Sequence, residues 1–330
     1  MKSIREWGLT PGFTILMVVL LGAAWTTLGQ AADAPYPTRP ISIIVPYGAG
    51  GGPDINARLV AAYWTKKLGQ PIAIVNKAGA AGALGYREIS HSQPDGYTLG
   101  AMQYPNSAVL VGLKGKEAGF ANEDMIPLGT FTRTPDVFAT RQGSPFKTFK
   151  EFIEHAKKNP GKITVSVPGE AHLLAVVLME QAFGVDVKPV MFKSGVEAFN
   201  TLLGGHVQTG MFVSQFAVTG KDKGIVPLAL TGSTRMESLA GVPFFKDLGH
   251  DVPVDMVTLF CAPKGTPEPI LKKLTTTLQE LGSNPEFVEK MKGTGVGYAP
   301  LFGAEMLKYY KDTCEAFGRV LAKNKELFAK

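Results

Sequence analysis

Four glycines in five positions mark the segment of the chain best suited to bind an anion. They lie in VPYGAGGGPD, residues 45–54, directly after the apolar run Ile41–Val45, which predicts a strand. A Walker-type phosphate loop needs Lys followed by Ser or Thr, and a dinucleotide fingerprint begun at Gly48 needs glycine where Pro53 stands, so both nucleotide templates fail. The segment still predicts a strand, then a glycine-rich loop in which a ligand can approach the backbone, then the start of a helix, whose backbone N–H groups favour negative charge. We therefore predict an anion site here.

The elements that must position this loop alternate between strand and helix patterns. Apolar spacing, two lysines in the last turn and Gly69 after it predict a helix over 54–68. A second glycine-rich turn, NKAGAAGALG at 76–85, opens another helix. Similar patterns predict strands at 71–75, within 94–102 and at 162–167, and helices at 149–158 and 171–183. This order predicts an α/β fold with mainly parallel sheets, whose ligands sit beyond the carboxyl ends of the strands.

The amino-terminal residues have the pattern of a secretory signal peptide. Lys2 and Arg5 form a basic region, Phe13–Ala24 is almost unbroken apolar sequence, and small residues at 29–31 suit a signal peptidase. The alternative is a retained membrane anchor, but the apolar stretch is shorter than the roughly 20 residues that a span needs. We predict a signal peptide over 1–31, cleaved near Ala31, and a periplasmic mature chain of roughly 300 residues, a length that suits two domains.

Composition argues against several other classes. The net charge is +6, but basic residues are scattered among acidic ones, so we expect no nucleic-acid partner. No G-x-S-x-G or H-E-x-x-H motif occurs, and no histidine stands beside an obvious nucleophile, so we expect no catalytic residue, metal or cofactor. The two cysteines, Cys261 and Cys314, form either one disulfide or two free thiols.

Seven motifs in a fixed order resemble one family across the chain from Tyr36 into the carboxyl-terminal helix. They are YPTRPISIIVPYGAGGGPDINARLVA, LGQPIAIVNKAGAAGALG, PDGYTL, HAKKNPGKITVSVPG, LLGGHVQ, PLALTGSTR and APKGTPEPI. They look like the landmarks of the Bug-type receptors, the extracytoplasmic substrate-binding proteins of tripartite tricarboxylate transporters. The resemblance implies a type II periplasmic binding protein, with two α/β domains joined by two crossovers and an interdomain cleft that closes on a small carboxylate.

This resemblance also implies the domain division and the partners. We expect domain one over 36–139 plus 257–330, and domain two over 140–256. The expected function is capture of a mono- or dicarboxylate by a monomer that delivers it to the membrane permease subunits of the transporter. Presentation of the closed receptor to a sensor kinase is the alternative, followed by a hydrolase on the same fold.

In domain one, the resemblance implies that the glycine loop and the KAGAAG turn approach the ligand carboxylate with backbone N–H groups. An acid beside an anion would repel it, so for Asp54 we favour a place in the first helical turn with local N–H donors. Alternatively, the two loops are tight turns that bind no ligand. Tyr47, Tyr104 and Asn106, the polar residues at strand ends, could equally lie on the surface. The ligand-binding residues predicted here are Tyr47, Gly48, Gly51, Gly52, Asp54, Ala80, Ala81, Gly82, Tyr104 and Asn106.

In domain two, the loop SVPGEAHL at 166–173 is about two residues shorter than the family's loop. Its Glu170 either meets a hydroxyl, amide or ammonium of the ligand or complements the start of the following helix, the interpretation we favour slightly. We interpret His172 as a structural histidine, and Ser194 either as a ligand contact or as a helix cap. Gln208 stands where the family usually has an acid. The ligand-binding residues predicted in this domain are Ser166, Gly169, Glu170, Ser194, Gly195 and Gln208.

Overall fold

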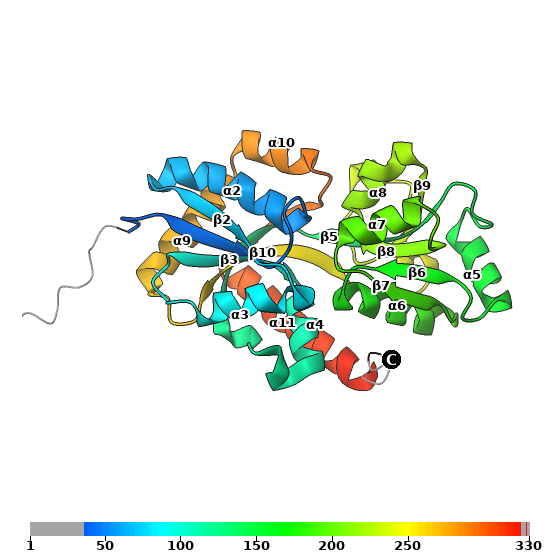
Figure 1. Cartoon of the computed structure of the whole chain (residues 1–330). Coiled ribbons are helices and arrows are strands. Elements are labelled where there is room, and N and C mark those ends of the chain that lie inside the picture. The colour runs from blue at the N-terminus through cyan, green and yellow to red at the C-terminus, as the bar shows by residue number, and fades with distance from the viewer. Residues whose placement is uncertain (1–35, 325–327, 329–330) are drawn as a thin grey trace, which may run out of the picture. The chain divides into compact units, whose positions relative to one another are not determined.

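The computed structural model describes residues 36–324 and 328, so the predicted signal peptide lies outside the described residues (Figure 1). Arg39–Lys330 form one compact unit that contains the described helices and strands. Over the part of the chain that the structure describes, none of the helices combines the length and the apolar character that a membrane span requires.

The strands are joined by hydrogen bonds into one continuous path, β2-β1-β3-β10-β5-β8-β6-β7. Beside this path, β4 pairs with β10, β11 pairs with β4, and β9 pairs with β5. We call the part built on β1–β4, β10 and β11 lobe one, and the part built on β5–β9 lobe two. The strands are β1 Ile41–Val45, β2 Ile72–Asn76, β3 Thr98–Tyr104, β4 Met125–Thr132, β5 Thr134–Arg141, β6 Thr164–Val167, β7 Lys188–Met191, β8 Thr209–Val213, β9 Ile225–Leu230, β10 Asp255–Pro263 and β11 Tyr298–Phe302.

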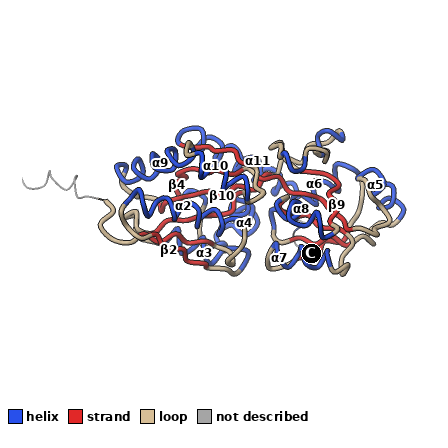
Figure 2. Tube along the Cα trace, turned by 90° about the horizontal axis from the view of Figure 1, so that it is seen from above, coloured by secondary structure: helices blue, strands red, loops and turns tan. Residues whose placement is uncertain are grey.

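Helices cover the strands of both lobes, as Figure 2 shows for strands in red and helices in blue. Those of lobe one are α2, α3, α4, α9, α10 and α11, and those of lobe two are α5 to α8. Their bounds are α2 Gly52–Leu68, α3 Ala83–His91, α4 Asn106–Lys114, α5 Phe149–Lys158, α6 Glu170–Phe183, α7 Gly195–Leu203, α8 Gln215–Gly220, α9 Glu268–Gly282, α10 Pro285–Gly293 and α11 Gly303–Asn324.

The prediction of mainly parallel sheets is wrong at the centre of the path. β1 pairs in parallel with β2 and β3, and β6 with β7 and β8. However, β10 runs antiparallel to β3, β4 and β5, and β5 runs antiparallel to β8 and β9. The reason is that β4 is followed directly by β5 and that β10 returns from lobe two, so neither strand belongs to a local strand–helix–strand repeat.

Each lobe has an apolar core made by these strands and helices. In lobe one, Ile44, Met102 and Leu259 are buried in the sheet. In lobe two, Val165 and Met211 of the sheet pack with helix residues. Val109 of α4 and Phe317 and Leu321 of α11 join this second cluster, so α4 and α11 tie the lobes together. The structure thus has two α/β lobes, as predicted, while the boundaries at 139/140 and 256/257 stay a prediction.

Candidate functional site

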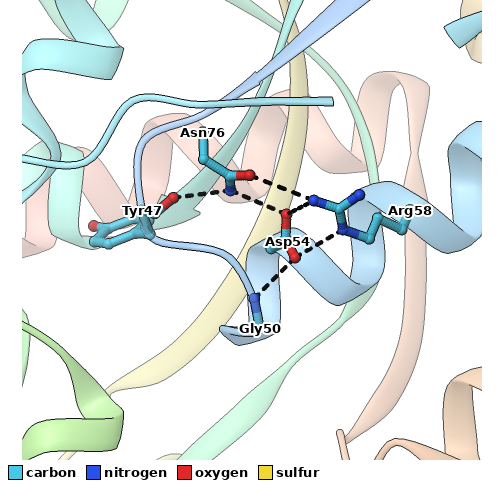
Figure 3. A network of polar contacts seen from close by, with 5 residues as sticks. All are labelled: Tyr47, Gly50, Asp54, Arg58 and Asn76. Atoms are coloured by element: carbon cyan, nitrogen blue, oxygen red, sulfur yellow. Dashed lines mark hydrogen bonds and ion pairs between the residues drawn. The ribbon is translucent and has the colours of Figure 1, made fainter. Parts of the chain in front are cut away.

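The glycine loop, residues 46–54, is held by the carboxylate of Asp54 (Figure 3). Asp54 Oδ2 accepts hydrogen bonds from Gly50 N and Arg58 Nε, both at 2.9 Å, and Oδ1 accepts from Arg58 Nη2 and Asn76 Nδ2, both at 3.0 Å. Asn76 Nδ2 also donates to the carbonyl of Tyr47 at 3.0 Å. Burial acts to raise the pKa of Asp54, but the hydrogen bonds and the charge of Arg58 outweigh it and lower that pKa. Asp54 thus accepts local N–H bonds, as predicted, and its carboxylate is engaged within the loop.

We expect Asp54→Asn to lose about 1–3 kcal/mol of unfolding free energy at neutral pH, because hydrogen bonds to a buried charge are lost. A carboxyl whose pKa is lowered by folding contributes stability above its unfolded pKa of about 3.9, and that contribution disappears as the pH falls through the folded pKa. Urea unfolding should therefore show the gap between wild type and variant closing below about pH 4. Glu286→Gln, which removes an exposed carboxylate paired with Lys290, is the control and should have the smaller effect. An equal loss in both variants would contradict the role of Asp54.

The start of α2 leaves backbone N–H groups available beside this loop. Gly51 is the N-cap in an extended conformation (φ −78°, ψ 166°), and the first helical bond runs from Ile55 N to Gly51 O at 3.0 Å. The N–H groups of Gly52 and Asp54 therefore have no acceptor within the helix, and Pro53 between them has no N–H. The left-handed residue of the loop is Gly50, with φ 83°, while Gly48 is exposed with open space where a Cβ would stand. These features suit an anion at the helix start.

A cavity that is open to solvent lies at this helix start, between the lobes, and the space in and above it, open solvent included, is about 370 Å³. Gly52 borders it from lobe one, and a Cβ built there would lie 3.5 Å from Gln215 Oε1 of α8 in lobe two. None of its lining residues carries a charge, so an anion held here would depend on amide, hydroxyl and backbone donors. The lining residues are Gly52, Pro53, Asn56, Gln103, Thr132, Thr134, Val213, Gln215, Phe216, Met256, Val257, Thr258 and Val296.

The second glycine-rich turn contains two left-handed alanines. Ala80 has φ 47° and Ala81 has φ 56°, values that cost an alanine of the order of 1–3 kcal/mol. The turn is closed by Gly82 N, which donates to Gly79 O at 2.9 Å. Asn106 Nδ2 donates to Ala81 O at 2.9 Å and so holds the strained segment in place. Strain kept by specific contacts at the end of a strand supports a functional role for this turn.

Asn106, the first residue of α4, connects both loops of lobe one to lobe two. Besides Ala81 O, its Nδ2 donates to the Tyr47 hydroxyl at 2.7 Å, and its Oδ1 accepts from Ala171 N of α6 at 3.2 Å. The Asn106 side chain is buried, so each of these groups depends on it. The structure thus places Asn106 at the junction of the lobes and not on the surface.

Two tyrosines extend this network toward the cavity. The hydroxyls of Tyr47 and Tyr86 lie 2.7 Å apart, and Tyr86 donates to the carbonyl of Gln103 at 3.1 Å. Since Tyr86 gives its proton to Gln103, Tyr47 donates to Tyr86. Burial raises the pKa of both tyrosines, so both stay neutral donors. Gly82 has φ 95°, and a Cβ there would lie 2.9 Å from Tyr86 Cε2 and 3.2 Å from the Tyr47 hydroxyl, which together explain the buried glycine.

Lobe two meets this network at the start of α6. Gly169 is the N-cap of α6, and Glu170 is its first residue. Burial raises the pKa of the Glu170 carboxyl, while its own amide, Lys114 and His172 act to lower it. The two neighbours of Glu170 in sequence contact lobe one, because Ala171 N donates to Asn106 Oδ1 at 3.2 Å and a Cβ at Gly169 would lie 3.6 Å from the same oxygen. Glu170 therefore does begin a helix, as we favoured, and it also faces the junction of the lobes.

Two predicted site residues lie elsewhere. The Tyr104 hydroxyl donates to Tyr310 O at 2.9 Å, so its side chain packs against α11 inside lobe one instead of forming a wall of the site. Gln208 exchanges hydrogen bonds with Thr164 at the amino ends of β6 and β8, whereas the loop that carries Glu170 follows the carboxyl end of β6. Both corrections have the same reason: nearness to a strand in sequence does not fix which end or face a side chain occupies.

The remaining residues predicted in lobe two are Ser166 in β6 and Ser194 and Gly195 at the start of α7. Ser166 is buried in β6, where its Oγ would lie 2.8 Å from a Cβ at Gly210, and it has no hydrogen-bond partner among the described residues. Ser194 is the N-cap of α7, and its side chain accepts from Glu197 N at 3.2 Å, which confirms the capping interpretation. A Cβ at Gly195 would lie 2.6 Å from the ring of Phe216, which borders the cavity. A ligand contact of Ser194 or Gly195 stays a prediction.

Sequence reasoning missed most of the cavity lining. Thr132, Thr134 and Thr258 lie on strands at the crossing between the lobes, and their local patterns mark only buried strands. Gln215 and Phe216 follow β8, a strand that is parallel to β6. The rule that ligands sit at the carboxyl ends of parallel strands would have found these two, had the strand at 209–213 been recognised.

The histidine and the cysteines of the sequence analysis have structural roles in the described residues. His172 Nδ1 lies 2.7 Å from Asp136 Oδ2, and both side chains are buried, which confirms a structural histidine. Cys261 and Cys314 are both free, so the disulfide alternative is wrong. Burial raises the pKa of the Cys261 thiol to about 12, which keeps it unreactive. Among the residues that the structure describes, no group of three or more potential ligand side chains is arranged to hold a metal ion.

Comparison with known proteins identifies the family to which this geometry belongs. The model of the tripartite tricarboxylate transporter family receptors, TctC, matches residues 56–325. The chain belongs to the TctC family. Its relatives include the UPF0065 protein in the gbd 5′ region of Cupriavidus necator, 30% identical over 279 residues, which are 82% of this chain and 85% of that protein. Protein BugT of Bordetella pertussis is 28% identical over 289 residues, 84% of this chain and 88% of BugT.

A solved TctC-type structure has the same fold. The periplasmic binding protein BugD superposes with a TM-score of 0.77 and 28% identity, covering 87% of this chain and 98% of BugD. These findings confirm the Bug-type resemblance and the fold that it implied. TctC proteins are solute-binding receptors, so the cavity between the lobes is the first candidate for the solute site.

Proposed function

We propose that this TctC receptor captures one small organic carboxylate between its lobes outside the cytoplasm and delivers it to the membrane subunits of a tripartite transporter. The observation that carries this proposal is the uncharged cavity at the start of α2, bordered by both lobes. A helix start with free N–H groups attracts an anion, and the cavity adds neutral hydroxyl and amide groups, with no acidic side chain among its lining residues to repel the anion. A carboxylate held in this way can be released when the lobes separate, which a transport receptor requires.

The family supports delivery to a transporter, because its description names these proteins as receptors of tripartite tricarboxylate transporters. The predicted signal peptide supports export of the chain. We expect the lobes to bind the ligand without catalysing a reaction on it. Incubation with candidate esters and amides should therefore leave them unhydrolysed.

A thermal-shift screen of organic acids tests the proposal. A ligand that binds only the native state adds about 2.7 kcal/mol of stability at a hundredfold excess over Kd, so the melting temperature should rise by several degrees. The uncharged primary amide of each acid is the control and should shift it less. Shifts with amines or sugars, together with none for any carboxylate, would refute the proposal.

A further inference from the structure

One oxygen of the Glu170 carboxylate has no hydrogen-bond partner although it is shielded from solvent. Glu170 Oε2 is among the buried polar atoms that lack a partner within the described residues. Its surroundings are formed by both lobes, because the next residue, Ala171, donates its N–H to Asn106 Oδ1 at 3.2 Å. A buried carboxylate oxygen without a donor costs free energy, so the contact between the lobes is incomplete at this point.

The groups that face Glu170 are already engaged or do not reach it. Lys114 of α4 is exposed and acts on it only through its charge. His172, the other basic residue that acts on it, bonds to Asp136 at 2.7 Å. In lobe one, the Tyr47 hydroxyl donates its hydrogen bond to the Tyr86 hydroxyl, and the Tyr86 hydroxyl donates to the Gln103 carbonyl. Each of these described groups therefore leaves Oε2 without a donor.

We propose that the missing donor belongs to the ligand, so that Glu170 selects organic acids bearing an ammonium or hydroxyl group and disfavours those with a second carboxylate. This inference rests on the proposed function, since it assigns the second group of a ligand whose carboxylate lies at the start of α2. A donor on the ligand would satisfy Oε2 when the lobes close. A second carboxylate would instead be buried beside a like charge.

Titration calorimetry of the full mature chain separates the two proposals. The panel contains propionate- to valerate-sized acids, each as the parent acid, the hydroxy acid, the amino acid and the dicarboxylate. Wild type should bind the amino or the hydroxy member at least about tenfold more tightly than the parent acid and the dicarboxylate, since hydrogen bonds to charged groups have this strength. Equal or weaker binding of both donor-bearing members would overturn the inference and leave the receptor proposal standing. No binding of any acid would overturn both.

Variants of Glu170 test whether this residue causes the preference for donor-bearing acids, and whether the donor is an ammonium or a hydroxyl group. An ammonium ligand needs the charge, so Glu170→Gln should remove the tenfold preference and improve dicarboxylate binding about tenfold. A hydroxyl ligand needs only an acceptor, so its preference should survive in Glu170→Gln and disappear in Glu170→Leu. Glu151→Gln, the same change in the first turn of α5, is the control and should keep the wild-type ranking. An unchanged ranking in both Glu170 variants would overturn the inference.

If neither Glu170 variant melts cooperatively, the role of Glu170 can be tested by titrating the wild-type protein at several pH values. Burial raises the pKa of Glu170, and lowering the pH protonates the carboxylate and removes its charge. An acid whose second anionic group is a sulfonate, which stays ionised, should therefore bind more tightly as the pH falls. The parent acid in the same titrations is the reference for pH effects on the rest of the site. A sulfonate-to-parent affinity ratio that does not change with pH would overturn the inference.

Discussion

Replacing Asn106 with leucine should weaken ligand binding about a hundredfold and lower the free energy of unfolding by about 2–4 kcal/mol. Leucine fills a similar volume, but it cannot donate to Ala81 O or to the Tyr47 hydroxyl, and it cannot accept from Ala171 N. The buried carbonyl and amide would be left without partners, the left-handed alanine turn would lose its support, and the lobes would lose a direct contact.

Ser107→Ala is the matched control for this variant. Ser107 is the next residue of α4 and is also buried, but its Oγ has no hydrogen-bond partner among the described residues. Removing that hydroxyl should be nearly neutral for stability and affinity. Urea unfolding measures the first effect and titration calorimetry measures the second. If Asn106→Leu and Ser107→Ala behaved alike, Asn106 would not be the connection between the loops that we describe.

The second large effect is expected from Gly52→Val, which should lower affinity at least about a hundredfold for every acid that binds wild type. Its Cβ would lie 3.5 Å from Gln215 Oε1, so the added methyl groups would occupy the cavity. Because Pro53 follows, a β-branched residue in the helical conformation also costs about 1 kcal/mol of stability. The variant should therefore fold with a slightly lower melting temperature and lose its ligand response in calorimetry.

Gly241→Val is the control for this change. Nothing lies within 4 Å of a Cβ built at Gly241, and this glycine is not among the residues that border the cavity. Its affinity for the acids should equal that of wild type. A folded Gly52→Val protein with unchanged affinity would remove the start of α2 from the ligand site.

The elements that sequence alone predicted are those with local signals. Ile41–Val45 and Phe149–Lys158 were predicted with their observed bounds, because apolar periodicity and capping residues lie within the segment itself. The segment from Val257 was recognised as an apolar strand, but its pairing was not predicted, since the pairing of Asp255–Pro263 with strands of both lobes depends on residues far apart in the chain.

The candidate site was predicted in part for the same reason. The glycine loop, the KAGAAG turn and Asn106 follow strand ends, and the structure brings them into contact through Asn106 and Tyr47. Of the glycines predicted in this loop, Gly52 borders the cavity. The left-handed alanines and the threonines of the crossing strands carry no sequence signal, because tertiary contacts impose the conformation of the former and the location of the latter.

The crystal structure of the mature chain with the acid that gives the largest thermal shift tests the central claim most directly. We predict one ligand per chain in the cavity between the lobes, with its carboxylate within hydrogen-bond distance of the backbone N–H groups at the start of α2 and with no basic side chain in contact with it. A carboxylate bound outside this cavity, or held there by an arginine or lysine side chain, would contradict the account.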